Sequence, residues 1–127
     1  MPHHPSNQKH SSHFEEKIKL RQLAMVLLEK NVINVLDCFH ANGTLWSEIS
    51  KRNFDTKIQV TGIEKDKTKT SSPYFVLYGD NERMLPKMDL SQYHIIDCDA
   101  YGDSTKAIQC IVKNPTLQNK VAIILTV

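Results

Sequence analysis

Hydrophobic positions along the chain alternate between short apolar runs and stretches with helical spacing. Short β-branched runs are typical of buried parallel strands, whereas an amphipathic helix repeats its apolar positions every three or four residues. The runs predict strands at 33–36, 57–63, 74–78, 93–96 and 121–127. The spacing predicts helices at 14–30, 44–52 and 104–113 and a short segment at 82–85. Strands that alternate with helices predict an α/β fold with a parallel sheet.

The first predicted helix, Phe14 to Lys30, has one apolar stripe that we expect to face the core. Its members recur at the spacing of neighbours on one helix face. They are Phe14, Ile18, Leu20, Leu23, Ala24, Leu27 and Leu28. The basic residues Lys17, Lys19 and Arg21 are interpreted as part of a solvated face, with contact to nucleic acid as the alternative.

Length, composition and charge describe one globular domain. The chain has 127 residues, of which 40% are hydrophobic, and a net charge of +2, too small to diagnose a nucleic-acid-binding protein. Residues 1–13 are polar and rich in histidine, which predicts a disordered arm ahead of a domain at 14–127. The sequence has neither a long apolar segment nor a secretory signal, so we expect a cytoplasmic protein.

Three cysteines, Cys38, Cys98 and Cys110, lie far apart and form no C-x-x-C pair. An odd number with this spacing predicts reduced thiols, and neither a disulfide framework nor a zinc site. The histidines of the arm have no carboxylate partners in a folded frame, so no metal site is expected there.

The stretch 32–46 predicts a strand, a tight loop and the start of a helix. Small residues at Ala41 and Gly43 let the backbone approach a ligand, and the first N–H groups of the following helix offer donors. Asp37 and Phe39 occupy the place where a dinucleotide-binding loop needs glycine. Because an acid repels a pyrophosphate, the loop favours a ligand with a cationic or amine group.

Two further acids follow the second and third predicted strands. Glu64 is placed to accept both hydroxyls of a ribose, which is equally compatible with NAD and with an adenosine-containing cofactor. Its alternative reading is a solvated charge in the run 64–67. Asp80 is a candidate for binding an adenine amine, with turn chemistry as the alternative and Asn81 as the cap of the segment at 82–85.

The fourth predicted strand ends in two acids, Asp97 and Asp99, followed by Tyr101. Alternate residues of an extended chain point to the same side, so the two carboxylates are expected to face the same way. They repel unless a cation or a hydrogen-bond donor lies between them. Ligands bind at this edge of open α/β sheets, which indicates a functional site.

The loop and the double acid together resemble two motifs of the class I S-adenosylmethionine-dependent methyltransferases. Asp37, Phe39 and Gly43 match the D-x-F-x-G-x-G variant of motif I, with Ala41 at its first glycine. The sequence D-x-D-A-Y-G resembles motif IV of the tRNA guanine-N2 dimethyltransferases and of related phage and microbial methyltransferase-like proteins. It comprises Asp97, Asp99, Ala100, Tyr101 and Gly102, and Asp103 and Ser104 depart from the Ser-Pro that follows in the family.

This resemblance implies a Rossmann-like three-layer α/β sandwich with strand order 3-2-1-4-5, shorter at its C-terminus than full methyltransferases. It implies transfer of a methyl group from S-adenosylmethionine to an amine of a nucleic acid, RNA or DNA, or of a nucleotide. The implied cofactor-binding residues are Asp37, Phe39, Ala41, Gly43, Glu64 and Asp80. The implied catalytic residues are Asp97, Asp99 and Tyr101.

Three alternatives remain at this stage. In the first, the chain is a catalytically silent or truncated cofactor-binding module that needs a partner chain. In the second, it is a partner-binding module whose fifth strand offers an open edge to another chain or a second copy. The third alternative, an NAD-dependent oxidoreductase, is disfavoured by Asp37 and by the absence of G-x-G-x-x-G.

Overall fold

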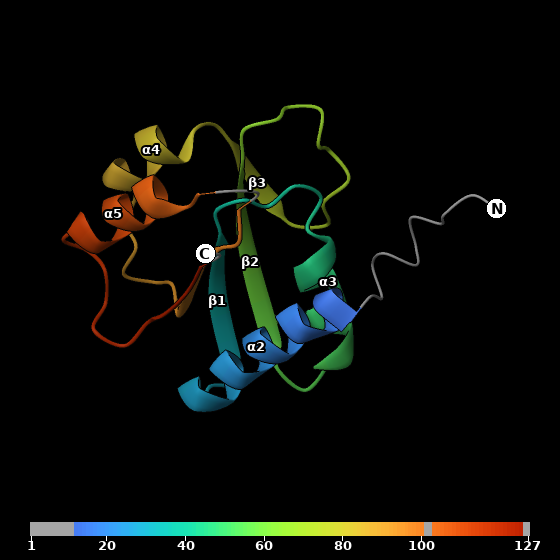
Figure 1. Cartoon of the computed structure of the whole chain (residues 1–127). Coiled ribbons are helices and arrows are strands. Elements are labelled where there is room, and N and C mark those ends of the chain that lie inside the picture. Colours follow the sequence, from blue (N-terminus) through green and yellow to red (C-terminus); the bar gives the residue numbers. More distant parts are fainter. Residues whose placement is uncertain (1–11, 101–102, 126–127) are drawn as a thin grey trace.

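The computed structural model describes residues 12–100 and 103–125 (Figure 1). Five strands form one sheet in the order β3-β2-β1-β4-β5, and every neighbouring pair is parallel. The strands are β1 (Val32–Asp37), β2 (Lys57–Glu64), β3 (Phe75–Tyr78), β4 (Ile95–Cys98) and β5 (Ala122–Leu125). The order and the parallel pairing confirm the prediction from the sequence.

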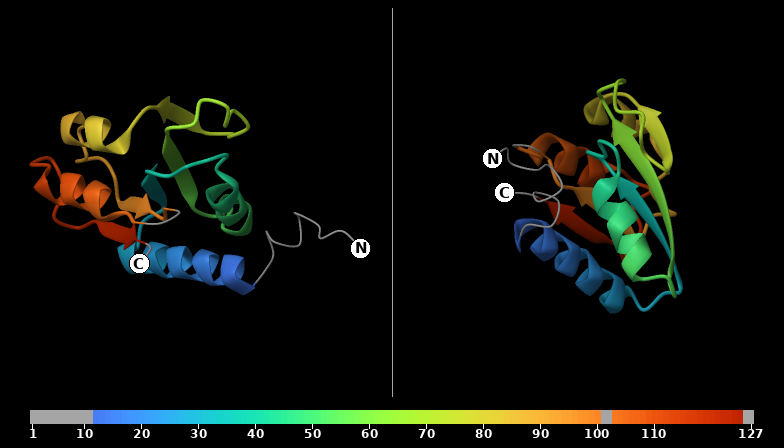
Figure 2. Two further views of the ribbon diagram at one scale, coloured as in Figure 1. Left: turned by 45° about the horizontal axis from the view of Figure 1, so that its top comes forward. Right: turned by 90° about the vertical axis from the view of Figure 1, so that its right-hand side faces the viewer.

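Helices cover both faces of the sheet, which gives the predicted three-layer Rossmann-like sandwich (Figures 1 and 2). The helices are α2 (Ser12–Leu28), α3 (Thr44–Arg52), α4 (Asn81–Met84), the 3-10 turn η1 (Leu85–Lys87) and α5 (Thr105–Lys113). Helices α2 and α3 pack on one face, and α4, η1 and α5 pack on the other. In the described part of the chain, no helix combines the length and apolar character needed to cross a membrane.

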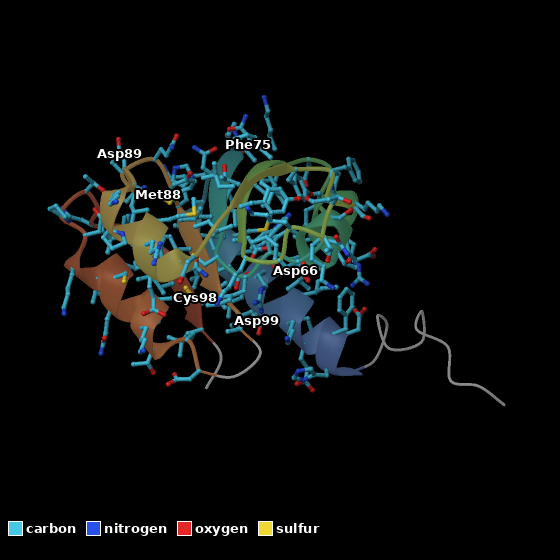
Figure 3. All side chains as sticks on the ribbon, turned by 90° about the horizontal axis from the view of Figure 1, so that it is seen from above. Asp66, Phe75, Met88, Asp89, Cys98 and Asp99 are labelled. Atoms are coloured by element: carbon cyan, nitrogen blue, oxygen red, sulfur yellow. The ribbon has the colours of Figure 1, made fainter. Side chains whose placement is uncertain are left out.

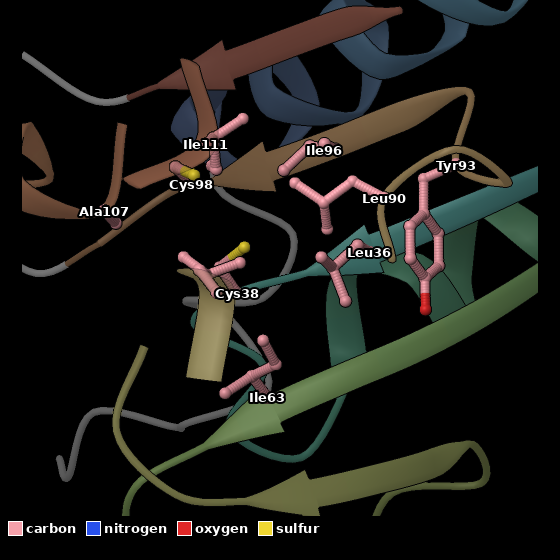
Figure 4. Close-up of a cluster of buried hydrophobic side chains, with 10 residues drawn as sticks. Leu36, Cys38, Ile63, Leu90, Tyr93, Ile96, Cys98, Ala107 and Ile111 are labelled. Carbon is pink, nitrogen blue, oxygen red and sulfur yellow. The ribbon is translucent and has the colours of Figure 1, made fainter. Parts of the chain in front are cut away.

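The core consists of two apolar clusters, one on each face, because successive residues of a strand point to opposite sides. In β1, Ile33 and Val35 belong to the cluster beneath α2 and α3, whereas Leu36 belongs to the other cluster, where Cys38 also lies. Figure 4 shows this second cluster, with Cys38 and Cys98 at neighbouring strand ends. All three cysteines are free thiols.

The segment 65–74 connects β2 to β3 without a helix, as its polar sequence predicts. Its backbone lies at the carboxyl ends of the strands, the end of the sheet that Figure 3 views. A loop at this edge of the sheet is a common place for binding residues. This loop therefore contributes directly to the candidate site.

The predicted core stripe of α2 was partly wrong. Leu20, Leu23 and Leu27 are 49%, 55% and 72% exposed, whereas Ile18 and Met25 are buried. Arg21 lies on the buried face and is only 2% exposed. The sequence of α2 is apolar on two faces, and the face that packs on the sheet is the one that carries Arg21, which forms a buried ion pair with Asp97.

Candidate cofactor-binding site

Two adjoining cavities lie at the carboxyl ends of the strands. The larger has a volume of about 600 Å³, and its lining includes Glu64 and Asp80. The smaller has a volume of about 320 Å³, and its lining includes Asp37 and Asp97. Phe39, Ala41 and Asp99 line both cavities. The loop after β1 thus separates two spaces that acids from several strands surround.

Glu64 holds two loops together at the larger cavity. Its Oε1 accepts a hydrogen bond of 2.6 Å from the backbone N–H of Ala41, and its Oε2 accepts one of 2.8 Å from the N–H of Asp66. Ala41 has a φ of 52°, in the left-handed region, so this bond helps to hold an unusual backbone conformation. Because each carboxylate oxygen has two lone pairs, Glu64 keeps the capacity to accept from further hydroxyls.

At the start of α4 the capping residue is Asp80 and not Asn81, which agrees with turn chemistry, the alternative prediction for Asp80. Asp80 is the N-cap, and its Oδ1 accepts from the backbone N–H of Glu82 at 2.9 Å. The prediction that Asn81 caps the helix was wrong, since Asn81 is the first helical residue and donates through Nδ2 to the carbonyl of Cys38 at 2.6 Å. Both side chains line the larger cavity.

A chain of three side chains crosses the floor of the site from Asp37 to the 65–74 loop. Asp37 Oδ2 lies 2.8 Å from His40 Nδ1, and His40 Nε2 lies 2.6 Å from the Ser72 hydroxyl. The His40 side chain is fully buried. His40 thereby connects the end of β1 to the loop between β2 and β3.

Two glycines provide the space that His40 fills. A Cβ at Gly62 would lie 2.3 Å from the His40 ring, and one at Gly43 would lie 2.7 Å from it. Gly43 also has a φ of +71°, which favours glycine. Gly43 was predicted to let a ligand approach, but it lines neither of the two cavities, and the open side of its backbone is covered by His40.

Replacing Gly62 with alanine is expected to lower the free energy of unfolding by about 1 to 3 kcal/mol, because the added methyl group displaces the buried His40 ring. Urea denaturation measures the change. The control is Gly79→Ala, where the nearest atom is the flexible end of Met84 and the cost is smaller. Equal losses in the two variants would contradict a specific role of the Gly62 contact.

Burial and neighbouring charge perturb Asp37. Loss of water around the carboxyl group raises its pKa from 3.8 to about 6, and the nearby charge of Asp97 acts in the same direction. The hydrogen bond to His40 and the charges of His40 and Arg21 oppose this rise. A carboxylate kept buried against such a cost indicates a functional position.

The Asp97 carboxylate accepts from four donors. Arg21 donates to both oxygens, from Nη2 at 2.9 Å and from Nε at 3.0 Å. Trp46 Nε1 donates to Oδ2 at 2.9 Å, and the backbone N–H of Asp99 donates to Oδ1 at 3.2 Å. The Asp97 side chain is 1% exposed. Its oxygens are therefore largely occupied by the protein itself.

Basic side chains from α2 neutralise the double acid. Arg21 Nη2 lies 3.3 Å from Asp99 Oδ2 as well as 2.9 Å from Asp97 Oδ1, so the guanidinium lies between the two carboxylates. Lys17 Nζ forms a second ion pair with Asp99 at 2.7 Å. The Arg21 guanidinium is thus the positive group that the sequence led us to expect between the two acids. Residues 12–100 and 103–125 contain no group of three or more side chains arranged to hold a metal ion.

The structure brings most of the predicted site residues to one edge of the sheet. Acids 37, 97 and 99 line the smaller cavity, acids 64, 80 and 99 line the larger, and Phe39 and Ala41 line both. Gly43 lines neither cavity and instead provides space for the His40 ring. Tyr101 lies outside the described residues, so its predicted role stays a prediction.

The sequence alone did not assign Arg21, Lys17, His40, Ser72 or Asn81 to the site. The predicted placement of Arg21 on a solvated face was wrong, since this side chain is buried. For Arg21 a signal was present, because it follows Ile18 by three residues and precedes Met25 by four, the spacing of one helix face. The contact between Arg21 and Asp97 spans 76 residues of sequence, and no local pattern reveals it. His40 lies three residues after Asp37, but only the fold brings Ser72 to its other ring nitrogen.

A search of solved structures shows which fold this chain shares. It superimposes with a TM-score of 0.61 and 19% identity on a Staphylococcus aureus protein provisionally assigned as a caffeoyl-CoA O-methyltransferase, covering 92% of this chain and 66% of that one. It superimposes equally well, at 14% identity, on the PH0226 protein of Pyrococcus horikoshii OT3, covering 91% of this chain and 55% of that one. This chain therefore spans about two thirds and about half of their lengths. No protein-family model and no curated protein matches the sequence.

Proposed function

We propose that this chain binds S-adenosylmethionine and transfers its methyl group to an amine of a nucleic acid or nucleotide. The observation that carries the proposal is the pair of adjoining cavities at the carboxyl ends of the strands, lined by acids at the carboxyl ends of β1, β2, β3 and β4. The methyltransferase-like fold supports it. When bound, the cofactor supplies an activated methyl group on a sulfonium centre.

The donor and acceptor groups fit such a cofactor. Glu64 has lone pairs left for two ribose hydroxyls in the larger cavity. Asp37, in the smaller cavity, provides a buried negative charge for an amino group or a sulfonium. Phe39, which lines both cavities, provides an apolar surface at the junction between them. Each half of the cofactor thus meets a side chain of suitable chemistry.

We assign different roles to Asp97, which lies in β4, and Asp99, which follows it. Asp97 already accepts four hydrogen bonds, so it positions Arg21 and the backbone of Asp99. Asp99 lines both cavities and is 14% exposed, so it is the better placed to accept an N–H of the target amine. Tyr101 would stack on the base, an interaction worth about 1 to 3 kcal/mol.

Calorimetric titration with S-adenosylhomocysteine tests cofactor binding, with NAD as the competing ligand. We expect S-adenosylhomocysteine to bind and NAD not to bind. Glu64→Gln is expected to weaken binding by about 10-fold to 100-fold, since a hydrogen bond to a charged group contributes about 1.5 to 3 kcal/mol. Asp89→Asn, which changes an exposed acid outside both cavities, is the control. Preference for NAD, or no binding of either ligand, would contradict the proposal.

A second candidate is a cofactor-binding module that acts with a partner chain. The exposed apolar residues of α2, Leu20, Leu23 and Leu27, favour it, together with β5, which among the described residues pairs with β4 alone. Methyl transfer by the isolated chain to a panel of RNAs and DNAs supports the enzyme. Cofactor binding without transfer, together with concentration-dependent sedimentation, supports the module.

A further inference from the structure

Lys17 occupies the position that the proposed function assigns to the target amine. Its Nζ lies 2.7 Å from Asp99 Oδ2, on the carboxylate proposed to accept an N–H of the acceptor. Lys17 also belongs to the lining of the smaller cavity, as does Asp37, the acid proposed to face the charged part of the cofactor. A primary amine of the chain itself therefore lies at the place where the acceptor is expected.

The first turns of α2 hold the Lys17 backbone at this place. The next residue, Ile18, is fully buried in the apolar cluster beneath α2 and fixes the helix on the sheet. Arg21 donates from Nη2 to Asp99 Oδ2 at 3.3 Å and from Nη1 to the Lys17 carbonyl at 3.2 Å. The Lys17 side chain, by contrast, is 33% exposed and carries its amine on a flexible four-carbon stem.

A dissolved acceptor competes with this amine at a disadvantage. An acceptor that donates to Asp99 Oδ2 must first displace the Lys17 ammonium from its ion pair. The Lys17 amine needs no binding step, because a group tethered to the chain has already lost most of its translational freedom. The arrangement thus favours the lysine of the chain as a first acceptor.

We propose that Lys17 is a methylation site and that the chain modifies it in cis. The inference rests on the proposed function. The Lys17 ammonium first loses a proton, which Asp99 accepts and passes to solvent. The Lys17 nitrogen then attacks the methyl carbon of S-adenosylmethionine with its lone pair, and the bond from that carbon to sulfur breaks with its electron pair remaining on sulfur. The products are a positively charged Nε-methyllysine and S-adenosylhomocysteine.

The test incubates the whole chain with S-adenosylmethionine that carries a deuterated methyl group, and mass spectrometry of peptides locates the label. We expect the label on Lys17 and at least about 10-fold less on Lys19, an exposed lysine of the same helix. The labelling rate per chain is expected to be independent of protein concentration, because the reaction takes place in cis. Asp99→Asn is expected to reduce the label on Lys17 by at least about 10-fold. Asp89→Asn, outside both cavities, is the matched control.

A binding measurement provides a second readout that needs no methyl transfer. In a chain with isotope-labelled lysine, titration with S-adenosylhomocysteine is expected to shift the nuclear magnetic resonance signal of the Lys17 ε-carbon and to leave that of Lys19 in place. Lys17→Arg, which keeps a cation beside Asp99, identifies the Lys17 signal by its disappearance.

The outcomes separate this inference from the proposed function. If S-adenosylhomocysteine does not bind, the proposed function fails and the inference fails with it. If it binds but Lys17 acquires no label, the proposed function stands and the inference is overturned, whether or not the Lys17 signal shifts. Equal label on Lys17 and Lys19, a rate proportional to protein concentration, or full labelling of Asp99→Asn would also overturn the inference.

Discussion

Replacing Arg21 with methionine is expected to lower the free energy of unfolding by about 3 to 5 kcal/mol, because it leaves the Asp97 carboxylate buried without its counterion. Arg21 and Asp97 are 2% and 1% exposed, and they form two hydrogen bonds of 2.9 and 3.0 Å. Methionine conserves most of the side-chain volume, so the loss reports the charge and not a cavity. Urea denaturation at pH 7 measures it.

Arg52 provides a matched control for this variant. It also binds a carboxylate through two nitrogens, with bonds of 2.7 and 2.8 Å to Glu15, but that pair is exposed to solvent. Arg52→Met is expected to change stability little, since water screens such pairs. The double variant Arg21→Met, Asp97→Asn is expected to recover part of the loss. Similar losses in Arg21→Met and Arg52→Met would show that burial does not determine the contribution of the ion pair.

Replacing Asp37 with asparagine is expected to stabilise the protein at neutral pH by up to about 3 kcal/mol, the free energy that corresponds to raising its pKa from 3.8 to about 6. Above this range the folded chain carries a buried charge that costs more than the same charge in the unfolded chain. Asparagine removes that cost and keeps an oxygen for His40. Cofactor binding is expected to weaken in the same variant.

The direction in which the stability gain of Asp37→Asn changes with pH tests whether the buried Asp37 charge is its cause. Between pH 3.8 and about 6 the folded chain holds the Asp37 proton more tightly than the unfolded chain, so the contribution of this group to stability is lost as the pH rises through about 6. The advantage of Asp37→Asn should therefore grow from pH 4 to pH 7 and then remain level. His40, Asp97 and Arg21 face Asp37 in both proteins.

Asp66→Asn is the control for the pH series. Asp66 is exposed, and its hydrogen bonds from Thr68 lower the pKa of its carboxyl group, so this substitution brings no gain that increases with pH. Denaturation of the three proteins at several pH values provides the comparison. An advantage of Asp37→Asn that is the same at pH 4 and pH 8 would exclude the buried charge as its origin.

The sequence was sufficient to predict the strands because each is marked by its own apolar run, and the family resemblance implied their order. The parallel order then places the ends of β1, β2 and β4 at one edge, so acids 37, 64 and 97 could be located before the structure was known. The hydrophobic pattern of α2 did not predict which side of the helix is buried, because two of its faces are apolar. The buried face is the one from which Arg21 contacts Asp97, a residue 76 positions away that no local pattern connects to it.

The hydrogen-bond partners of the site residues could not be predicted from the sequence for a related reason. The sequence places Asp80 and Asn81 side by side but does not say which of them caps the helix and which keeps an unpaired oxygen. Likewise, it places Asp97 and Asp99 on one side of the chain, but the four donors around Asp97 come from α2, α3 and the loop after β4. Such assignments depend on distances between separate segments.

Glu64 joins the loop after β1 to the loop after β2 through the amides of Ala41 and Asp66. A ligand that displaces these amides would release both segments, whereas a ligand that uses the remaining lone pairs would immobilise them. Deuterium uptake at the two amides therefore distinguishes the two modes of occupancy. The residue proposed to bind the ribose thus also couples occupancy of the site to the mobility of its rim.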